Sequence, residues 1–405
     1  MLLSTNLQEK LLSISQFLPL IWMTGFMHFD GKGDMLFVAL VVVFVFLSLS
    51  FGGISIVLKN IKGNFWFFLL LLFSLQLSLY YILLGADSGF MRVMISTIAF
   101  LFFFDVNKIY IIKRMVPYFI FSIAIGYLYY IVIYNQGIAR GNWSVNAIPF
   151  AYNVSVAIVI STALLFYFRG LIERFFLLLA SLALVFALLL SGSRGPIFSM
   201  LLVGLMGFLF LIYKRKWKVV FLLLSILFLL TLISFTYFPY LFERIMYLSV
   251  ELGVLSEGNF NTSVGYRLKM WIVGFEMLLE MPWYGYGKDA LMDEILLLIK
   301  NGGVDENTGQ FALNHFHNGY LDICLRYGYL GLLIFLLLVL HPIWWAKKYS
   351  SNDALFLLSS LCILQMLVNI SEYNNIHPQS AIYFLVPIGV AILFFKDKNE
   401  SKVLS

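Results

Sequence analysis

Apolar residues occur along this chain in uninterrupted runs of about 20, separated by polar or glycine-containing connections. Runs such as 177–190 and 219–232 show no alternation of apolar and polar positions. Alternation would be required for the strands of a transmembrane barrel. A run of about 20 apolar residues is long enough to cross the hydrocarbon core of a membrane as an α-helix. The pattern therefore predicts membrane-spanning helices.

Counted by length, these runs predict twelve spanning helices. They lie near residues 11–28, 35–58, 65–85, 91–106, 116–134, 148–168, 171–190, 195–213, 219–238, 319–341, 353–370 and 379–395. The predicted fold class is an all-α polytopic membrane protein.

One long connection lies between the ninth and tenth predicted helices. This segment, residues 239–316, is far longer than connections between packed helices usually are. Helical patterns over 266–281 and 288–300 predict that it folds into short helices above the membrane surface. The chain then divides into residues 1–238 with helices one to nine, the segment 239–316, and residues 317–405 with helices ten to twelve and a C-terminal tail.

Composition agrees with this interpretation. Of 405 residues, 61% are hydrophobic and only 12% are charged, about half the charged fraction of a soluble domain. The two cysteines, Cys324 and Cys362, lie inside apolar runs, and their spacing fits neither a disulfide framework nor a metal site. The first apolar run has no basic region and small-residue cleavage site around it, so we interpret it as a retained helix.

The net charge of +6 comes from short basic clusters between the apolar runs, which is the pattern of an orientation signal and gives no reason to expect a nucleic-acid partner. With twelve helices, all of these clusters fall on one side, which is then the cytoplasm. Both termini are predicted to be cytoplasmic, and the segment 239–316 to be periplasmic, in a bacterial inner membrane. The residues are Lys10, Lys59, Lys62, Lys108, Lys113, Arg114, Arg169, Arg174, Lys214, Arg215, Lys216, Lys218, Lys347, Lys348, Lys396, Lys398 and Lys402.

Three polar motifs fall on the predicted outer side. The first, Ser-Gly-Ser-Arg-Gly-Pro at 191–196, forms the tip of the hairpin between helices seven and eight. Backbone N–H groups at a helix start beside the guanidinium of Arg194 would suit a phosphate. The alternative is an ordinary polar turn whose arginine reaches the interface.

The second motif, Gly-Tyr-Arg-Leu-Lys-Met-Trp at 265–271, opens an amphipathic stretch in the long segment. Arg267 and Trp271 are four residues apart and share a helix face. A helix of this kind can lie in the membrane interface with its tryptophan at headgroup depth. A surface helix without a ligand is the alternative.

The third motif, Asn-His-Phe-His-Asn-Gly-Tyr at 314–320, lies where the long segment re-enters the membrane. A neutral imidazole, from His315 or His317, can act as a base near neutral pH. His-x-His is also a metal-ligand spacing, but no Asp, Glu or Cys cluster nearby completes a site, so no metal is expected. The alternative is polar capping of a membrane helix. Asp322 and Arg326 are expected to pair across one helical turn.

Arg140 is a further outward arginine, and Arg92 of the preceding outer loop is expected to join it. Arginines on the outer side are exceptions to the rule that basic residues are concentrated on the cytoplasmic side. Neutralising a diphosphate at the lipid surface would explain them.

In their order, spacing and topology, the three motifs resemble the O-antigen ligase and polymerase superfamily. Arg-Tyr-Gly-Tyr-Leu-Gly-Leu at 326–332 is similar to the segment after the histidine motif in many members. The resemblance extends from about Arg140 onward. The His-x-His-Asn form resembles the ligases more than the polymerases.

The resemblance implies a metal-independent, inverting glycosyltransferase of the type C kind that needs no cofactor. A ligase would transfer polysaccharide from undecaprenyl diphosphate to lipid A–core or another glycan acceptor, in contact with membrane lipids. A polymerase would extend the glycan on its lipid carrier. The implied catalytic residues are His317, Arg267 and Arg194, and the implied substrate-binding residues are Arg140, His315 and Asn318.

A lipid-linked oligosaccharide transporter is the alternative from another class of protein. Twelve helices with both ends inside would suit it. The missing internal repeat and the scarcity of charge within the membrane argue against it. A purely structural scaffold would leave the outward arginines and histidines unexplained.

Overall fold

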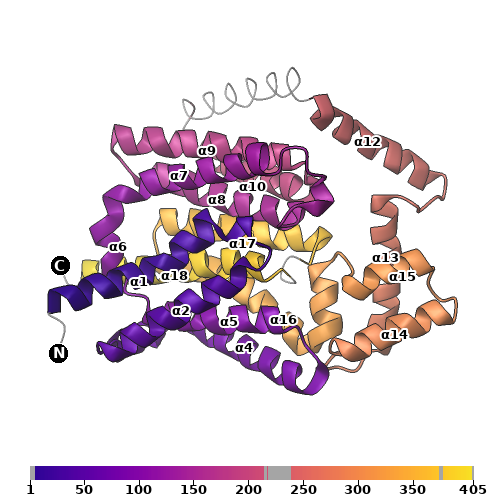
Figure 1. Ribbon diagram of the computed structural model, residues 1–405, viewed down its shortest axis with the longest axis horizontal. Coiled ribbons are helices and arrows are strands. Elements are labelled where there is room, and N and C mark those ends of the chain that lie inside the picture. The colour runs from indigo at the N-terminus through magenta and orange to yellow at the C-terminus, as the bar shows by residue number, and fades with distance from the viewer. Residues whose placement is uncertain (1–4, 214–216, 218–238, 374–376, 404–405) are drawn as a thin grey trace.

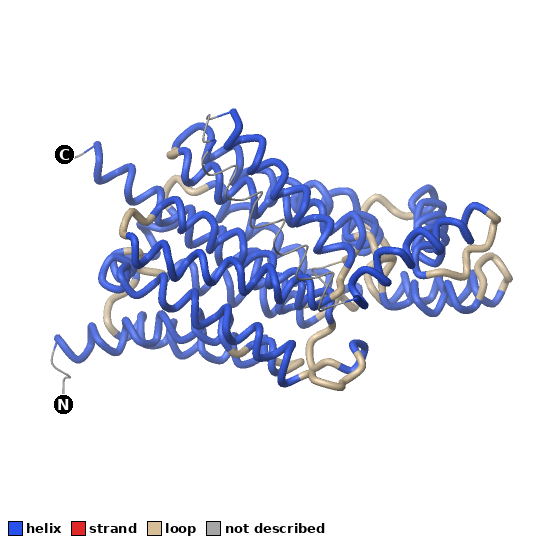
Figure 2. Tube along the Cα trace, turned by 90° about the horizontal axis from the view of Figure 1, so that it is seen from above, coloured by secondary structure: helices blue, strands red, loops and turns tan. Residues whose placement is uncertain are grey.

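The computed structural model describes all residues except 1–4, 214–216, 218–238, 374–376 and 404–405. The regular elements of this described part are all helical. Long helices form a bundle, and shorter helices form a cap at one end of it (Figure 1). Seen from above, the described ends of the chain lie at the opposite end from the cap (Figure 2). The two described ends of the chain thus lie at the same end of the bundle.

The first part of the chain runs through the bundle as consecutive helices, most of them hairpin-connected. They are α1 (Thr5–Gly25), η1 (Met27–Phe29), α2 (Gly33–Ser50), α3 (Ile54–Ile61), α4 (Phe65–Leu84), α5 (Ser88–Phe103), α6 (Asn107–Ile112), η2 (Lys113–Met115), α7 (Val116–Tyr129), η3 (Tyr130–Tyr134), η4 (Arg140–Asn142), α8 (Ala147–Tyr167), α9 (Leu171–Ser191) and α10 (Arg194–Tyr213).

The rest of the chain builds the cap and then returns to the bundle. The cap consists of α12 (Pro239–Ser256), α13 (Ser263–Glu280), α14 (Asp289–Lys300) and α15 (Glu306–Asn314), and the bundle is completed by α16 (Gly319–Tyr349), α17 (Asn352–Ser371) and α18 (Pro378–Val403). The helices expected over 266–281 and 288–300 correspond to α13 and α14. Helices α12 and α15 were not predicted.

Eight segments of the described chain are long and apolar enough to cross a membrane. These segments are Gly33–Ser50, Phe65–Leu84, Asn107–Tyr134, Ala147–Tyr167, Leu171–Ser191, Gly319–Tyr349, Asn352–Ser371 and Pro378–Lys398. Two shorter apolar helices cover Ser88–Phe103 and Arg194–Leu209. The chain is a multi-pass membrane protein. The count of twelve spans stays a prediction, and the expected span 219–238 lies outside the described residues.

Several helix boundaries differ from those expected. The single helix predicted over 35–58 is wrong, because α2 ends at Ser50 and α3 starts at Ile54. Gly52 between them has a φ of 84°, a left-handed conformation that glycine adopts without steric penalty. The tenth predicted helix begins at Gly319 as expected but continues to Tyr349 instead of ending at 341.

The bundle packs around α8 and α18, whose side chains are buried along most of their length. Peripheral helices expose large apolar side chains, such as Phe46 at 68% and Ile82 at 74%. In water this would be unfavourable, but it suits a surface in contact with lipid tails. The two cysteines are buried and free, so the expected absence of a disulfide between them is confirmed.

The cap is packed on the outer part of α16 by an apolar core of its own. Met270 and Met277 of α13 are buried together with Ile295 of α14, Ala312 of α15 and Leu325 of α16. Because this core is continuous across four helices, it fixes α13 relative to the start of α16. Arg267 on α13 is thereby held in position relative to the histidines that precede α16.

A break in α16 strengthens this attachment. Gly328 has φ 70° and ψ −177° and interrupts the helix, and the turn 282–287 of the cap docks at the break. Three backbone hydrogen bonds join them: Tyr286 N–H to the Leu325 carbonyl at 2.8 Å, Gly287 N–H to the Arg326 carbonyl at 3.1 Å, and Tyr329 N–H to the Trp283 carbonyl at 3.1 Å.

Gly328→Ala is expected to destabilise the protein by about 1–3 kcal/mol or more. The backbone at this position is accessible in practice only to glycine, and a Cβ would come within 2.4 Å of the carbonyl carbon of Tyr284. Thermal unfolding of the purified protein in detergent measures the effect. Gly253→Ala on α12 is the control, because a Cβ there meets nothing within 4 Å. Equal unfolding temperatures for both variants would contradict this account of the break.

Candidate active site

The third motif forms the short link between α15 and α16. Within it, His317 has a φ of 53°, and it is the one non-glycine residue with positive φ in the described part of the chain. Such a left-handed conformation costs of order 1–3 kcal/mol and persists only where the surroundings enforce it. The indole N–H of Trp271 donates to the His317 carbonyl at 3.3 Å. The strained link is thus held against α13.

The expected Asp322–Arg326 pair is present near the start of α16 and holds the link through hydrogen bonds. Arg326 Nε lies 3.6 Å from Asp322 Oδ1. Asp322 Oδ2 accepts the backbone N–H of Phe316 at 2.9 Å, and Arg326 Nη2 donates to the Asn314 carbonyl at 2.9 Å. The Asn314 carbonyl and the Phe316 N–H flank His315, so the pair fixes the backbone on either side of His315.

Asn318 serves the link as a helix cap. Its side-chain oxygen accepts the N–H groups of Tyr320 at 3.1 Å and Leu321 at 3.2 Å, which satisfies donors at the start of α16. The expected contact of Asn318 with substrate stays a prediction.

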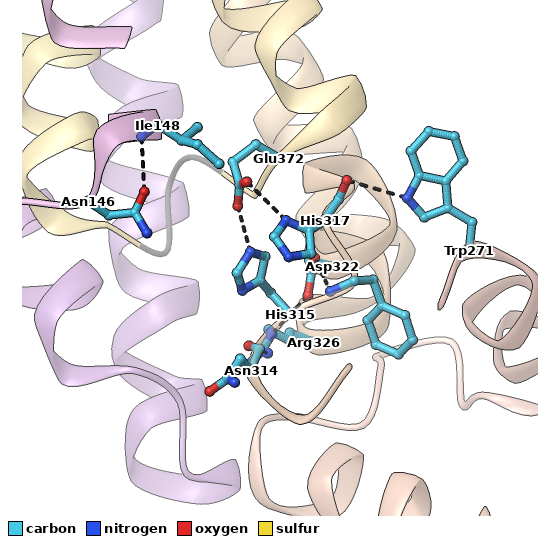
Figure 3. Close-up of polar contacts among 10 residues, drawn as sticks. Asn146, Ile148, Trp271, Asn314, His315, His317, Asp322, Arg326 and Glu372 are labelled. Carbon is cyan, nitrogen blue, oxygen red and sulfur yellow. Dashed lines mark hydrogen bonds and ion pairs between the residues drawn. The ribbon is translucent and has the colours of Figure 1, made fainter. Parts of the chain in front are cut away.

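Glu372, at the end of α17, joins both histidines (Figure 3). His315 Nε2 lies 2.5 Å from one carboxylate oxygen, and His317 Nδ1 lies 3.0 Å from the other. Glu372 is only 3% exposed. The expectation that no carboxylate completes the histidine motif is therefore wrong. Together the three side chains can hold a metal ion, since one ligand atom from each lies within 4.8 Å of the others.

The charges of these groups depend on one another. Burial alone would lower the pKa of His315, but the hydrogen bond and the charge of Glu372 outweigh it and raise that pKa above 6.5. Burial would likewise raise the pKa of the Glu372 carboxyl, yet the two imidazoles lower it well below its usual range. At neutral pH Glu372 is therefore a carboxylate, and it orients His317 through Nδ1. The other ring nitrogen, Nε2, is then the one placed to accept a proton.

Two arginines from separate elements face this group. Arg267 on α13 interacts electrostatically with Glu372, Arg194 and Glu251, and burial lowers the pKa of its guanidinium. Arg194, at the start of α10, places Nη1 2.6 Å from the carboxylate of Glu251 on α12. Glu251 is 3% exposed, whereas a third of the Arg194 side chain remains accessible. Arg267 is thereby linked electrostatically both to Glu372 of the histidine group and to the Arg194–Glu251 pair.

The hairpin tip at 191–196 consists largely of small residues, because it packs closely against neighbouring segments. A Cβ on Gly195 would come 2.8 Å from the hydroxyl of Ser371, one residue before Glu372. Ser193 donates to the Ala147 carbonyl at 2.8 Å and accepts a hydrogen bond from Arg140 Nη2 at 2.5 Å. The third predicted arginine is thereby brought to the tip. The guanidinium of Arg92 lies 3.9 Å from Asp34, and its expected place beside Arg140 stays a prediction.

Residues 179–336 match the family described as O-antigen ligase. The matched segment runs from within α9 to within α16 and includes Arg194, Arg267, His315 and His317. This segment of the chain is similar to the O-antigen ligase family. The resemblance found in the sequence motifs is confirmed.

A second comparison extends over a shorter part of the chain. An uncharacterized protein of Haemophilus influenzae is 27% identical over 129 residues. The aligned region is 32% of this chain and 32% of that protein, so the chain matches about a third of its relative's length. Glu372 and Arg140 lie outside the segment 179–336 that matches the O-antigen ligase family, and only the fold brings them to its residues.

Glu372→Gln is expected to destabilise the protein most strongly between pH 4.5 and 6.5. Glu372, whose pKa is lowered on folding, contributes stability above its ordinary value of 4.5, and this contribution is lost as the pH falls through the lower folded value. His315, whose pKa is raised, contributes stability below its ordinary value of 6.5, and this is lost as the pH rises through the raised value.

Unfolding temperatures of wild type and Glu372→Gln, measured in detergent over a series of pH values, test this linkage. Glu276→Gln on the exposed face of α13 is the matched control. A difference between wild type and Glu372→Gln that does not change with pH would show that the imidazole–carboxylate pair does not stabilise the fold.

Proposed function

We propose that this protein is an O-antigen ligase that transfers a polysaccharide from a polyprenyl-diphosphate carrier, undecaprenyl diphosphate, to a lipid A–core acceptor. The observation that carries the proposal is the convergence of Arg194, Arg267 and a carboxylate-oriented His317 at the cap end of a membrane bundle. All three residues lie within the segment 179–336 that matches the O-antigen ligase family. With the termini in the cytoplasm, as the basic clusters predict, this end faces the periplasm.

The arginines supply charge for the leaving group. When the bond between the anomeric carbon and the phosphate oxygen breaks, negative charge develops on the diphosphate, which stays on its lipid. Arg194 and Arg267 offer planar donor sets suited to phosphate, with Arg140 as a third from the hairpin tip. Fixed donors aimed at developing charge lower the barrier because they need no reorganisation during the reaction.

His317 supplies the base. Its Nε2 takes the proton of the acceptor hydroxyl while the hydroxyl oxygen attacks the anomeric carbon from the face opposite the leaving diphosphate, and this inverts the configuration. The imidazolium that forms is stabilised by Glu372 through Nδ1. His315, already paired with the same carboxylate, keeps Glu372 in place and lies beside the acceptor site.

The proposed reaction needs no cofactor, because the arginines carry out the charge neutralisation for which many glycosyltransferases use a divalent ion. The partners are the lipid-linked glycan, the acceptor glycan and membrane lipids. The location is a bacterial inner membrane. A polymerase would use the same groups with a lipid-linked glycan as the acceptor.

Surface glycolipids of a deletion strain, separated on a gel after complementation with wild type or His317→Asn, test the proposal. For a ligase, the deletion strain and the variant show core-only lipopolysaccharide and long polymer held on undecaprenyl diphosphate. Core bearing a single repeat unit would identify a polymerase. An unchanged ladder would overturn the glycan-transfer proposal and mean that the substrate class is wrong.

A further inference from the structure

Three donor atoms of the site converge in the way that a transition-metal site requires. One ligand atom from each of His315, His317 and Glu372 lies within 4.8 Å of the other two. The nitrogens that face the carboxylate are Nε2 of His315 and Nδ1 of His317. In a tetrahedral zinc site the metal–ligand distances are about 2.0–2.2 Å, which places ligand atoms roughly 3–4 Å apart.

The donors are also preorganised. Side-chain exposure is 15% for His315, 22% for His317 and 3% for Glu372, so little solvent has to be displaced. The link that carries the histidines is fixed by Trp271 and by the hydrogen bond from Phe316 to Asp322. Two imidazoles with one carboxylate favour zinc and related transition metals over magnesium or calcium, which prefer oxygen ligands.

A third imidazole lies next to this group. The ring centroid of His377 is 6.5 Å from that of His315. The negative charge of Glu372 acts on this imidazole as well. Burial lowers the pKa of His377 to about 4, so this imidazole is neutral at neutral pH, as a ligand must be. It can complete the coordination or orient the bound ion.

We propose that His315, His317 and Glu372 bind one Zn²⁺ ion, and that the zinc-bound form of the protein is catalytically inactive. The second half rests on the proposed function. A neutral imidazole has one protonated and one unprotonated nitrogen. Zinc on His317 Nδ1 therefore leaves the proton on Nε2, and Nε2 can then no longer accept the proton of an acceptor hydroxyl. The ion also occupies the carboxylate that stabilises the imidazolium.

The positive charge of Arg267 interacts with Glu372. Arg267 therefore competes with a bound cation for this carboxylate and weakens zinc binding. Zinc is therefore expected to bind reversibly and more weakly than in a closed structural site. This gives the inference a specific signature: Arg267→Met should bind Zn²⁺ more tightly than wild type although it transfers glycan poorly. A role of these residues in catalysis alone would not produce that opposite effect.

Zinc titration of the purified full-length protein in detergent, monitored by calorimetry and by the absorption of substituted Co²⁺, tests the binding. The purification tag must be free of histidine. We expect one equivalent for wild type and at least about 10-fold weaker binding for His315→Ala and for Glu372→Gln. His341→Ala is the matched control, because His341 lies near the other end of α16 beside Phe65 and Trp344. It should bind as wild type does.

The outcomes separate the two proposals. Absence of zinc binding, or wild-type binding by His315→Ala, would overturn the metal site. Zinc binding without loss of transfer activity would overturn its inhibitory effect, as would activity that is abolished by a chelator and restored by zinc. One bound equivalent in a protein that transfers no glycan would support the metal site while the proposed function fails.

Discussion

Replacing His317 with asparagine should lower the rate of glycan transfer by about 100-fold or more. The imidazole is the proposed base, and an amide cannot take a proton from the acceptor hydroxyl. Asparagine is the informative substitution, because it tolerates the left-handed backbone that His317 adopts. Loss of activity then reflects missing chemistry and not a relaxed link. Single-turnover transfer by purified protein from a lipid-diphosphate glycan measures the effect.

His341→Asn is the control for this substitution, since it removes an imidazole remote from the site in the same helix that follows His317. Its transfer rate should equal that of wild type. If His317→Asn kept more than about a tenth of the wild-type rate while remaining folded, general base catalysis by this residue would be excluded.

Arg267→Met should lower the rate of transfer by about 100- to 1000-fold, the usual effect of removing one donor from a developing anion. Methionine keeps an apolar stem for packing in α13 and loses only the charged end. Arg267 is a cleaner target than Arg194, because removal of Arg194 leaves the buried carboxylate of Glu251 unpaired, which would destabilise the fold. Transfer rates at saturating donor measure the effect.

Lys269→Met provides the comparison on the same helix. The Lys269 ammonium lies 3.1 Å from Asp305, on the more exposed side of the cap, and exposed pairs of this kind contribute little to stability. We expect nearly wild-type transfer. Similar losses of transfer rate in Arg267→Met and Lys269→Met would mean that the rate depends on the net charge of the cap. A specific contact of Arg267 with the diphosphate would then be ruled out.

Local patterns in the sequence were sufficient for much of the fold. Apolar runs predicted the helices, because a helix that contacts lipid must be apolar around most of its surface. The amphipathic stretches at 266–281 and 288–300 predicted α13 and α14. The break at Gly52 was missed, since a glycine pair inside an apolar run interrupts the helix without changing its hydropathy. Helix α15 was missed because its sequence, residues 306–314, is short and mostly polar.

The site was predictable only as far as its motifs are contiguous. His315 and His317 are two residues apart, so their proximity was certain from the start. Glu372 follows His317 by 55 residues, and only the packing of α17 against α16 and the hairpin tip brings it to them. An acidic residue at the outer end of an apolar run, such as Glu372 after 353–370, was the one available signal. Glu251 gave no signal of this kind.

The docking of turn 282–287 onto the break in α16 also determines where the protein can be altered. Peptide insertion within this turn would break the three backbone hydrogen bonds that join it to α16. Asn301 in the exposed turn 301–303 offers the opposite case, since its backbone has an ordinary φ of −83°. An epitope tag or a fluorophore-bearing cysteine introduced there would report which side of the membrane the cap occupies, without disturbing the residues that the cap holds in place.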